Sequence, residues 1–116
     1  VAEAFALARK AGVDPVKVRE ALLGGFAQSR VLEVHGQRVL DGNYKPGFRT
    51  NLYDKDLRNV VATLAEYDIP APISAIVHKL VHATMVAGRG DDDSSIMAQT
   101  VLEQAGVGER RGFEDR

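Results

Sequence analysis

Apolar residues recur along most of this chain at intervals of three and four residues, the spacing that places side chains on one face of an α-helix. Glycines, prolines and capping residues interrupt this pattern and divide it into segments of helical length. The segments expected to be helical are Val1–Ala11, Pro15–Leu23, a stretch from a Ser29 cap to Leu40, Leu52–Glu66, Ile73–Ala87, and a stretch from an Asp93 or Ser94 cap to Gln104. Runs of β-branched residues that would suit strands are scarce. The pattern therefore predicts an all-α fold with five or six helices in a compact bundle.

Several segments have recognisable end signals. Gly12 is placed to end the first helix, and Asp14 followed by Pro15 is typical of an N-cap and a first helical residue. Asn51 is placed to cap the fourth helix, with Asp54 three residues later. These signals predict where the helices begin and end.

One face of each predicted helix is apolar and is expected to contact the core. The positions on these faces are Val1, Ala4, Phe5 and Ala8; Val18, Ala21 and Leu22; Val31, Leu32, His35 and Val39; Leu57, Val60, Val61 and Leu64; Ile73, Ile76, Val77, Leu80, Val81 and Met85; and Ile96, Met97, Val101 and Ala105. The segment Ile73–Ala87 has the strongest pattern. We expect it at the buried centre of the domain or of a dimer.

The composition is that of one globular domain. The chain has 116 residues, with 15 Lys and Arg, 16 Asp and Glu, a net charge of −1 and no Cys. Near-neutral charge argues against a nucleic-acid-binding protein, and the lack of Cys excludes disulfides and thiolate catalysis and fits a reducing cytoplasm. The most apolar stretch, Ile69–Val77, is far shorter than the ~20 residues of a membrane span, and no signal-peptide pattern is visible. We expect a cytoplasmic domain over residues 1–105 and a loosely held charged tail over 106–116.

Two groups of residues resemble metal ligands. His78 and His82 are four residues apart on a predicted helix, the spacing at which two imidazoles can share a metal. A third ligand would have to come from elsewhere, for example from the acidic run Asp91–Asp93. We interpret the histidines as half-exposed residues that flank the apolar face, and the acidic run as capping before the sixth helix. The sequence therefore predicts no metal site.

A second polar region lies between Tyr44 and Leu57. Lys55 and Asp56 fall near the expected start of the fourth helix, where the helix dipole disfavours a cation by ~0.3–1 kcal/mol. A cation and an acid beneath a Pro-Gly-aromatic loop that contains Phe48 would suit an anionic or hydroxylated ligand. An ordinary surface ion pair is the alternative interpretation.

The run Lys45-Pro-Gly-Phe-Arg-Thr-Asn-Leu-Tyr-Asp-Lys-Asp-Leu57 resembles the C-terminal domain of the β-hydroxyacid dehydrogenase family. Further similarities lie in Lys10–Pro15, Gly24–Ser29 and Pro70–Ile76, so the resemblance covers nearly the whole chain. It implies an all-α domain that closes over the substrate of a two-domain enzyme, whose other domain is of the Rossmann type and binds NAD or NADP. The family interconverts a β-hydroxyacid and its semialdehyde by hydride transfer. The implied reaction is reduction of tartronate semialdehyde (2-hydroxy-3-oxopropionate) to glycerate, with a 3-hydroxyisobutyrate-type substrate as the alternative.

Three positions of this chain match functional positions of the family. Lys55 matches the Lys that contacts the cofactor, and Phe48 and Asp56 match positions that lie against the substrate and the nicotinamide. The family's catalytic Lys and its Gly-rich dinucleotide fingerprint have no counterpart from Val1 onward, so we expect no catalytic residue here and no activity from this chain alone. The resemblance also implies a homo-oligomer, a dimer or tetramer paired through this domain. A protein of another class, a free-standing all-α dimerisation module without activity, is the remaining alternative.

Overall fold

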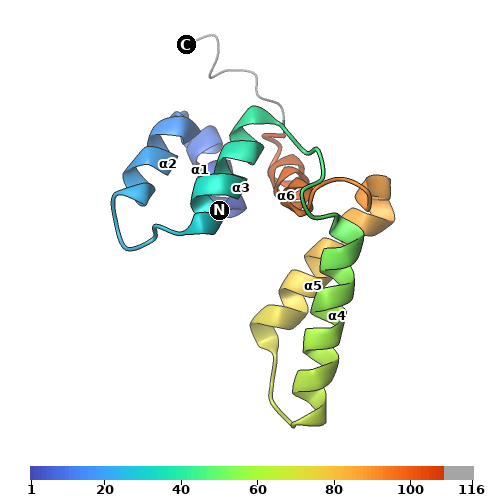
Figure 1. Cartoon of the computed structure of the whole chain (residues 1–116). Helices are drawn as coiled ribbons and strands as arrows, with labels where there is room; N and C mark the ends of the chain where they lie inside the picture. The colour runs from blue at the N-terminus through green and yellow to red at the C-terminus, as the bar shows by residue number, and fades with distance from the viewer. Residues whose placement is uncertain (109–116) are drawn as a thin grey trace. The chain divides into compact units, whose positions relative to one another are not determined.

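The computed structural model describes residues 1–108, which are helical and contain no strand. The helices are α1 (Ala2–Ala11), α2 (Pro15–Leu23), α3 (Arg30–Asp41), α4 (Thr50–Glu66), α5 (Pro72–Thr84) and α6 (Met97–Gln104), with a π-helical turn η1 (Met85–Arg89) after α5 and a 3-10 turn η2 (Ser94–Ile96) before α6 (Figure 1). The prediction of an all-α fold is confirmed. The described chain divides into two units: one comprises Val1–Asn43 and residues 98–108, and the other is Tyr44–Met97.

The first unit is built around the fully buried ring of Phe5. Its other buried apolar residues come from α1, α3 and α6: Ala6, Ala8, Leu32, Val39, Leu40, Ala98 and Leu102. Gly36 of α3 lets the helices approach closely, since a Cβ added there would lie 3.6 Å from Phe5 Cζ. Side chains also join the elements, because Arg19 donates to the carbonyl of Glu33 at 2.8 Å and Arg9 donates to that of Val107 at 2.9 Å. The core of this unit is therefore made by residues far apart in sequence.

The predicted ends of the first three helices are confirmed. Gly12 follows α1 in a left-handed conformation (φ 76°), which a residue with a side chain adopts at a cost. Asp14 caps α2 by accepting the N–H of Val16, and Ser29 caps α3 by accepting the N–H of Leu32. These helices end where local chemistry predicts because each cap is completed within a few residues of sequence.

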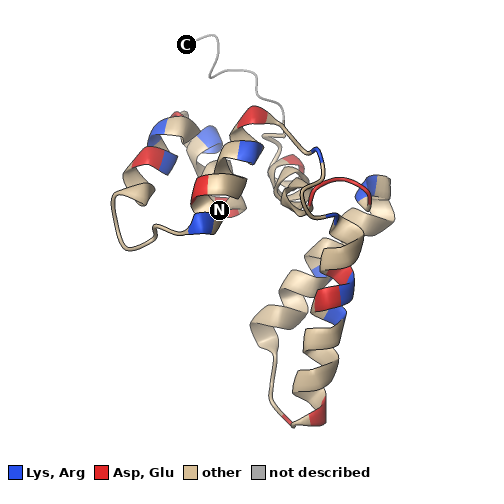
Figure 2. Ribbon diagram, in the orientation of Figure 1, with Lys and Arg blue, Asp and Glu red and all other residues tan. Residues whose placement is uncertain are grey.

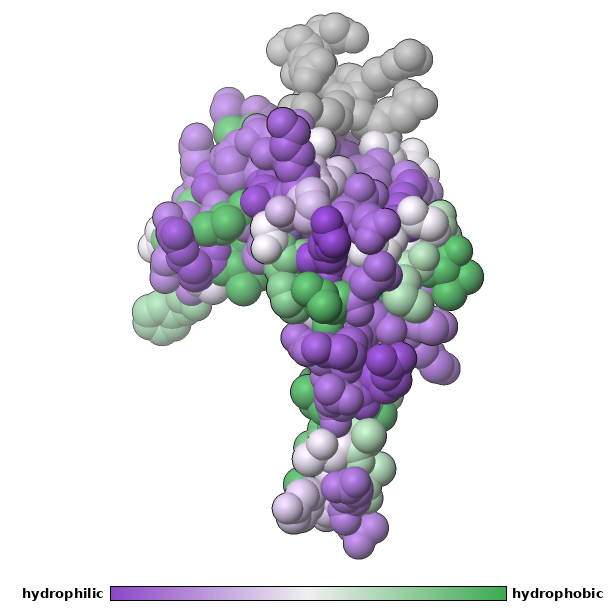
Figure 3. Space-filling view, turned by 45° about the vertical axis from the view of Figure 1, so that its right-hand side comes forward, coloured by the Kyte–Doolittle hydropathy of each residue, from purple (hydrophilic) through white to green (hydrophobic). Residues whose placement is uncertain are grey.

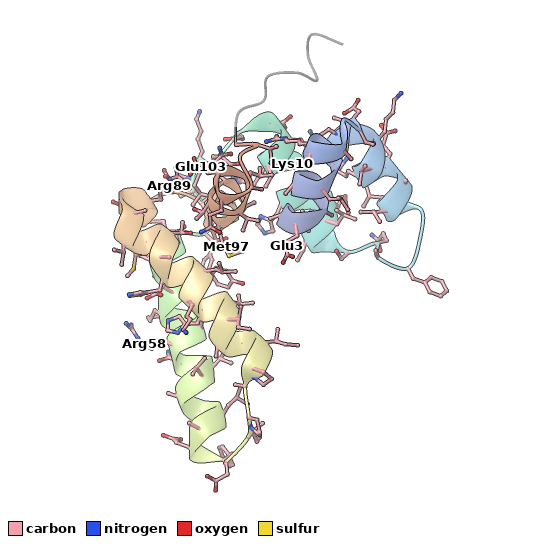
Figure 4. All side chains as sticks on the ribbon, turned by 180° about the vertical axis from the view of Figure 1, so that it is seen from behind. Glu3, Lys10, Arg58, Arg89, Met97 and Glu103 are labelled. Atoms are coloured by element: carbon pink, nitrogen blue, oxygen red, sulfur yellow. The ribbon has the colours of Figure 1, made fainter. Side chains whose placement is uncertain are left out.

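The second unit is dominated by α4 and α5, two helices that pack against each other (Figures 1 and 4). The residues of α4 that are at least partly covered include Asp54, Leu57, Val61 and Leu64, at helical spacing. Facing them, α5 buries Val81 completely and half-buries His78 and Leu80. The two helices are joined at Tyr67–Ala71, where Asp68 has a positive φ of 53°.

Several residues predicted to be buried are exposed. They are Val1, Ala21, Val31, Val60, Ile73 and Ile76. The largest errors are on α5, where 76% of Ile73 and 61% of Ile76 remain exposed. Two packed helices cover only one strip of each other, so a wide apolar face stays partly uncovered. Ile73–Ala87 is therefore not the fully buried centre of this domain, and its burial in a dimer stays a prediction.

The predicted start of α4 and end of α5 also need correction. The helix α4 begins at Thr50 rather than Leu52, and Asn51 is inside it instead of capping it. The regular α5 ends at Thr84, because the chain widens into η1 and Gly88 takes a positive φ of 91°. At the start of α4, hydrogen bonds to the distant carbonyls of Gly90 and Asp92 replace the local signal.

The segment after α6 is partly described. The N–H of Val107 donates to the carbonyl of Leu102 at 2.9 Å, and Gln99 donates to that of Gly108 at 2.8 Å. The remainder of the predicted tail, 109–116, lies outside the described residues. Within the part of the chain that is described, no helix is both long and apolar enough to cross a membrane.

Candidate functional site

The loop before α4 is held by one buried carboxylate, that of Asp93. Its Oδ1 accepts the main-chain N–H groups of Gly47 at 2.9 Å and Phe48 at 3.0 Å. Its Oδ2 accepts the N–H of Ser95 at 3.1 Å and the Ser95 hydroxyl at 2.6 Å. The predicted capping role of Asp93 is confirmed, and the same side chain also fixes a loop 45 residues earlier in the sequence.

These four hydrogen bonds determine the charge state of Asp93. Burial by itself raises the pKa of the carboxyl group, but the hydroxyl of Ser95 and the N–H groups of Phe48, Ser95 and Gly47 outweigh this effect. Together they lower the pKa of Asp93 from 3.8 to about 2. The carboxylate is therefore charged at neutral pH and anchors the loop in its ionised form.

The start of α4 is capped by main-chain carbonyls from the segment Gly90–Asp92. Thr50 N–H donates to the carbonyl of Asp92, and Asn51 N–H donates to that of Gly90, each at 2.9 Å. The Thr50 hydroxyl also donates to Asp92 O at 3.1 Å. These N–H groups are thus already used, and an anionic ligand here would have to be bound by side chains.

Phe48 is fixed through its backbone while its ring stays accessible. Its carbonyl accepts the N–H of Ser94 at 2.7 Å, in addition to the bond from its own N–H to Asp93. The ring contacts Tyr53 of α4 edge to face, with centroids 6.4 Å apart. An exposed aromatic ring on a rigid backbone provides an apolar wall for a ligand.

Lys55 and Asp56 point away from the packed face of α4. Their side chains are 55% and 54% exposed, and Lys55 Nζ lies 3.9 Å from Asp56 Oδ1. Lys55 is the sixth residue of α4, not a first-turn residue as predicted, so the helix dipole has little effect on it. Figure 2 shows that the charged residues of α4 are concentrated in its first half, which contains both Lys55 and Asp56.

The structure therefore places the three predicted site residues on one anchored segment. Lys55 and Asp56 lie beside each other, whereas the ring of Phe48 packs against Tyr53. All three side chains are exposed, so each is accessible to a ligand. What the sequence did not reveal is that Asp93 holds the loop, since no local motif links it to Phe48.

A second polar group, formed by Asp54, His78 and His82, lies between α4 and α5. The sequence pattern pointed to the two histidines, but it suggested Asp91–Asp93 for a third ligand. Asp93 is instead used for capping, and Asp54 takes this place. The sequence did contain a signal for Asp54: it lies three residues before Leu57, a spacing that places it on the covered face of α4.

Comparison with known proteins shows strong similarity to one family. Residues 1–101 match the family described as "NAD-binding of NADP-dependent 3-hydroxyisobutyrate dehydrogenase". The chain is 40% identical to 2-hydroxy-3-oxopropionate reductase of Escherichia coli K12 over 87% of its length and 35% of that protein. It is 32% identical to L-threonate dehydrogenase of Cupriavidus necator, over 81% of this chain and 32% of the relative.

A solved structure agrees with these sequence relationships. The crystal structure of 3-hydroxyisobutyrate dehydrogenase from Salmonella typhimurium superposes with a TM-score of 0.81 at 28% identity. The match covers 85% of this chain and 35% of that structure. The chain thus spans about a third of the length of the proteins it matches.

Proposed function

Since this chain belongs to the family of NAD-binding domains described for NADP-dependent 3-hydroxyisobutyrate dehydrogenase, we propose that it is the helical part of an NAD(P)-dependent β-hydroxyacid dehydrogenase. The reaction is hydride transfer between the nicotinamide and a small hydroxyacid or its semialdehyde. The observation that carries this proposal is the exposed Lys55–Asp56 pair on α4, whose start is anchored by Asp93 next to Phe48. This arrangement supports a ligand-contacting surface within a family of dehydrogenases.

We assign each exposed residue a binding role. The ammonium group of Lys55 is a donor for a cofactor oxygen, and its separation of 3.9 Å from Asp56 leaves it available for such a bond. Asp56 accepts hydrogen bonds from substrate hydroxyls, and Phe48 excludes water from the hydride path. The nicotinamide, when bound, supplies or accepts the hydride.

The proposed substrate is tartronate semialdehyde, which the enzyme reduces to glycerate. The 40% identity to 2-hydroxy-3-oxopropionate reductase supports this choice. Substrates of the 3-hydroxyisobutyrate or L-threonate type are the alternatives. They are supported by the similarity to those relatives, although the identities are lower. We expect the 116-residue chain alone to be inactive, because this domain provides one cation toward the cofactor and no assigned acid–base group.

A role in self-association is supported by the surface of α4 and α5. Ile73 and Ile76 are exposed, together with Val60, Tyr67 and Ile69. Figure 3 shows hydrophobic side chains on the surface of this helix pair, and Figure 2 shows few charges on α5 or on the second half of α4. Exposed apolar groups of this kind favour burial against a partner, so we propose a homodimer, or a tetramer built from such dimers.

A chimera tests the proposed function. Residues 1–101 of this chain would replace the matching third of the Escherichia coli 2-hydroxy-3-oxopropionate reductase, and NAD(P)H-dependent reduction of tartronate semialdehyde would be measured. We expect activity whose kcat/KM falls by ~10- to 100-fold on Lys55→Ala but is retained with the exposed control Lys79→Ala. A folded chimera that binds NAD(P)H but reduces none of the three substrate types would contradict the dehydrogenase assignment and favour the inactive dimerisation module.

A further inference from the structure

Three potential ligand atoms converge where α4 packs against α5. His82 Nδ1 and His78 Nε2 each lie 3.2 Å from Asp54 Oδ1. The three ligand atoms all lie within 4.8 Å of one another. The histidines are one helical turn apart on α5, and their rings meet edge to face with centroids 6.0 Å apart. Two helices therefore direct two imidazoles and one carboxylate toward the same point.

Hydrogen bonding among these residues leaves one group unsatisfied. His82 Nδ1 is hydrogen bonded to Asp54 Oδ1. The buried Nε2 of His78 is equally close to that oxygen, yet among the described residues it has no hydrogen-bond partner of acceptable geometry. A buried polar atom that lacks a partner is unfavourable. A group that accepts lone pairs from all three atoms would satisfy it.

The burial of Asp54 also calls for a positive charge. Its side chain is only 3% exposed, and the arginine that pairs with it, Arg58, has Nη1 4.0 Å from Oδ2. Figure 4 shows Arg58 projecting from α4. Arg58 is itself 63% exposed, so its attraction to Asp54 is weakened by solvent. The carboxylate therefore has capacity for a closer and more strongly charged partner.

The two histidine–carboxylate distances suit a tetrahedral metal ion, and all three ligand atoms lie within 4.8 Å of one another. Ligands at about 2.0–2.1 Å from a tetrahedral Zn²⁺ lie about 3.3 Å apart, close to the two distances of 3.2 Å. Imidazole with carboxylate is a donor set for late first-row metals, whereas Mg²⁺ and Ca²⁺ prefer oxygen ligands alone. The His82 side chain is 53% exposed and provides a path for entry and for a water ligand.

We propose that Asp54, His78 and His82 bind one late first-row divalent cation, such as Zn²⁺, which links α4 to α5. The fourth position is open to water. The ion stabilises the helix pair that presents Lys55 and Asp56, because it binds the folded arrangement and not the unfolded chain. This inference does not depend on the dehydrogenase assignment.

The test is a titration of the untagged 116-residue chain with Zn²⁺, in which isothermal titration calorimetry measures the affinity and the number of ions bound. We expect one ion per chain, and at least tenfold weaker binding in each of His78→Gln, His82→Gln and Asp54→Asn. The matched control is His35→Gln, which removes the remaining histidine of the chain, on α3, and should bind Zn²⁺ as the wild type does. Circular dichroism confirms that each variant is folded.

Two further measurements separate a built site from surface binding. Co²⁺ should give the intense visible absorption of tetrahedral coordination, and this band should disappear in the His78→Gln/His82→Gln double variant. Saturating Zn²⁺ should raise the Tm of the wild type by about 5 °C and leave that of the double variant unchanged. Equal affinity in the wild type and the double variant, or one ion per two chains, would overturn the proposal.

Discussion

Asp93 Oδ1 accepts the main-chain N–H of Phe48 at 3.0 Å, although 45 residues separate them in sequence. The same carboxylate caps η2 through Ser95. One ionised side chain thus holds the loop before α4 and the turn before α6 in a single arrangement. Because Phe48 is a candidate ligand-contacting residue, this bond couples the stability of the second unit to the shape of its site.

The lowered pKa of Asp93 makes the second unit sensitive to acid. Because the pKa falls from 3.8 to about 2 on folding, the ionised carboxylate stabilises the fold above pH 3.8 and loses this effect as the pH falls toward 2. The contribution at neutral pH is about 2 kcal/mol. Asp93→Asn should therefore lower the free energy of unfolding in urea by about 2 kcal/mol at pH 7.

The control for this prediction is Asp91→Asn, which removes an exposed carboxylate from the same acidic run. It should change the free energy of unfolding by less than about 0.5 kcal/mol. Between about pH 4 and pH 2 the wild type should lose stability more steeply than Asp93→Asn. Parallel pH profiles for the two proteins would show that Asp93 does not titrate as described.

Lys55→Ala tests the cofactor role without disturbing the core. In an enzyme that contains this domain, loss of a charge-assisted hydrogen bond of about 1.5–3 kcal/mol should lower cofactor affinity or kcat/KM by ~10- to 100-fold. Lys55→Arg should rescue only part of this loss, because a planar guanidinium does not replace a compact ammonium. Asp56→Ala and Phe48→Ala should act mainly on the KM for substrate and on kcat.

The stability of Lys55→Ala is a separate readout. Since Lys55 is exposed and lies beyond the first turn of α4, we expect the Tm to change little. Unchanged kinetics toward both cofactor and substrate would make Lys55 an ordinary surface residue. A large drop in Tm would instead point to a structural role.

Two glycines should respond in opposite ways to alanine. Gly88 in η1 has a φ of 91°, so Gly88→Ala should destabilise the fold by about 1–2 kcal/mol even though no atom lies within 4 Å of the added Cβ. Gly24 after α2 has a right-handed φ of −82° and room for a Cβ. Gly24→Ala should therefore stabilise the chain by about 0.4–1 kcal/mol. Urea unfolding of both variants checks the prediction, and the same sign for both would refute it.

Self-association through α5 can be tested at two exposed isoleucines. The wild-type chain should sediment as a dimer at tens of micromolar, a concentration at which an ordinary interface is occupied. Ile73→Gln/Ile76→Gln should weaken the dimer by at least ~10-fold, because each buried isoleucine contributes about 1.5–3 kcal/mol. Leu7→Gln, a change at an exposed residue of α1, is the control and should leave the dimer intact. A monomeric wild type at this concentration would refute the proposed pairing.

The first three helices could be predicted from sequence because their signals are local, whereas α6 begins at Met97, after the 3-10 turn η2 that Asp93 caps. The Asp14 and Ser29 caps and the left-handed Gly12 depend on atoms within a few residues. Each can therefore be predicted from its own segment of the sequence. The all-α class followed for the same reason, since helical spacing of apolar residues is a property of each segment alone. The run Lys45–Leu57 likewise indicated the family and the candidate residues, because its motif is one uninterrupted stretch of sequence.

Tertiary structure decided what depends on distant partners. Asn51 does not cap α4, because the carbonyls of Gly90 and Asp92 accept the first N–H groups of this helix. Hydrophobic periodicity contains no information about such hydrogen bonds. Ile73 remained exposed because periodicity specifies an apolar face but not how many helices cover it. The convergence of Asp54 on His78 and His82 required the register of α4 against α5. Sequence alone determines helices and their faces; only packing determines which faces, and which polar atoms, meet.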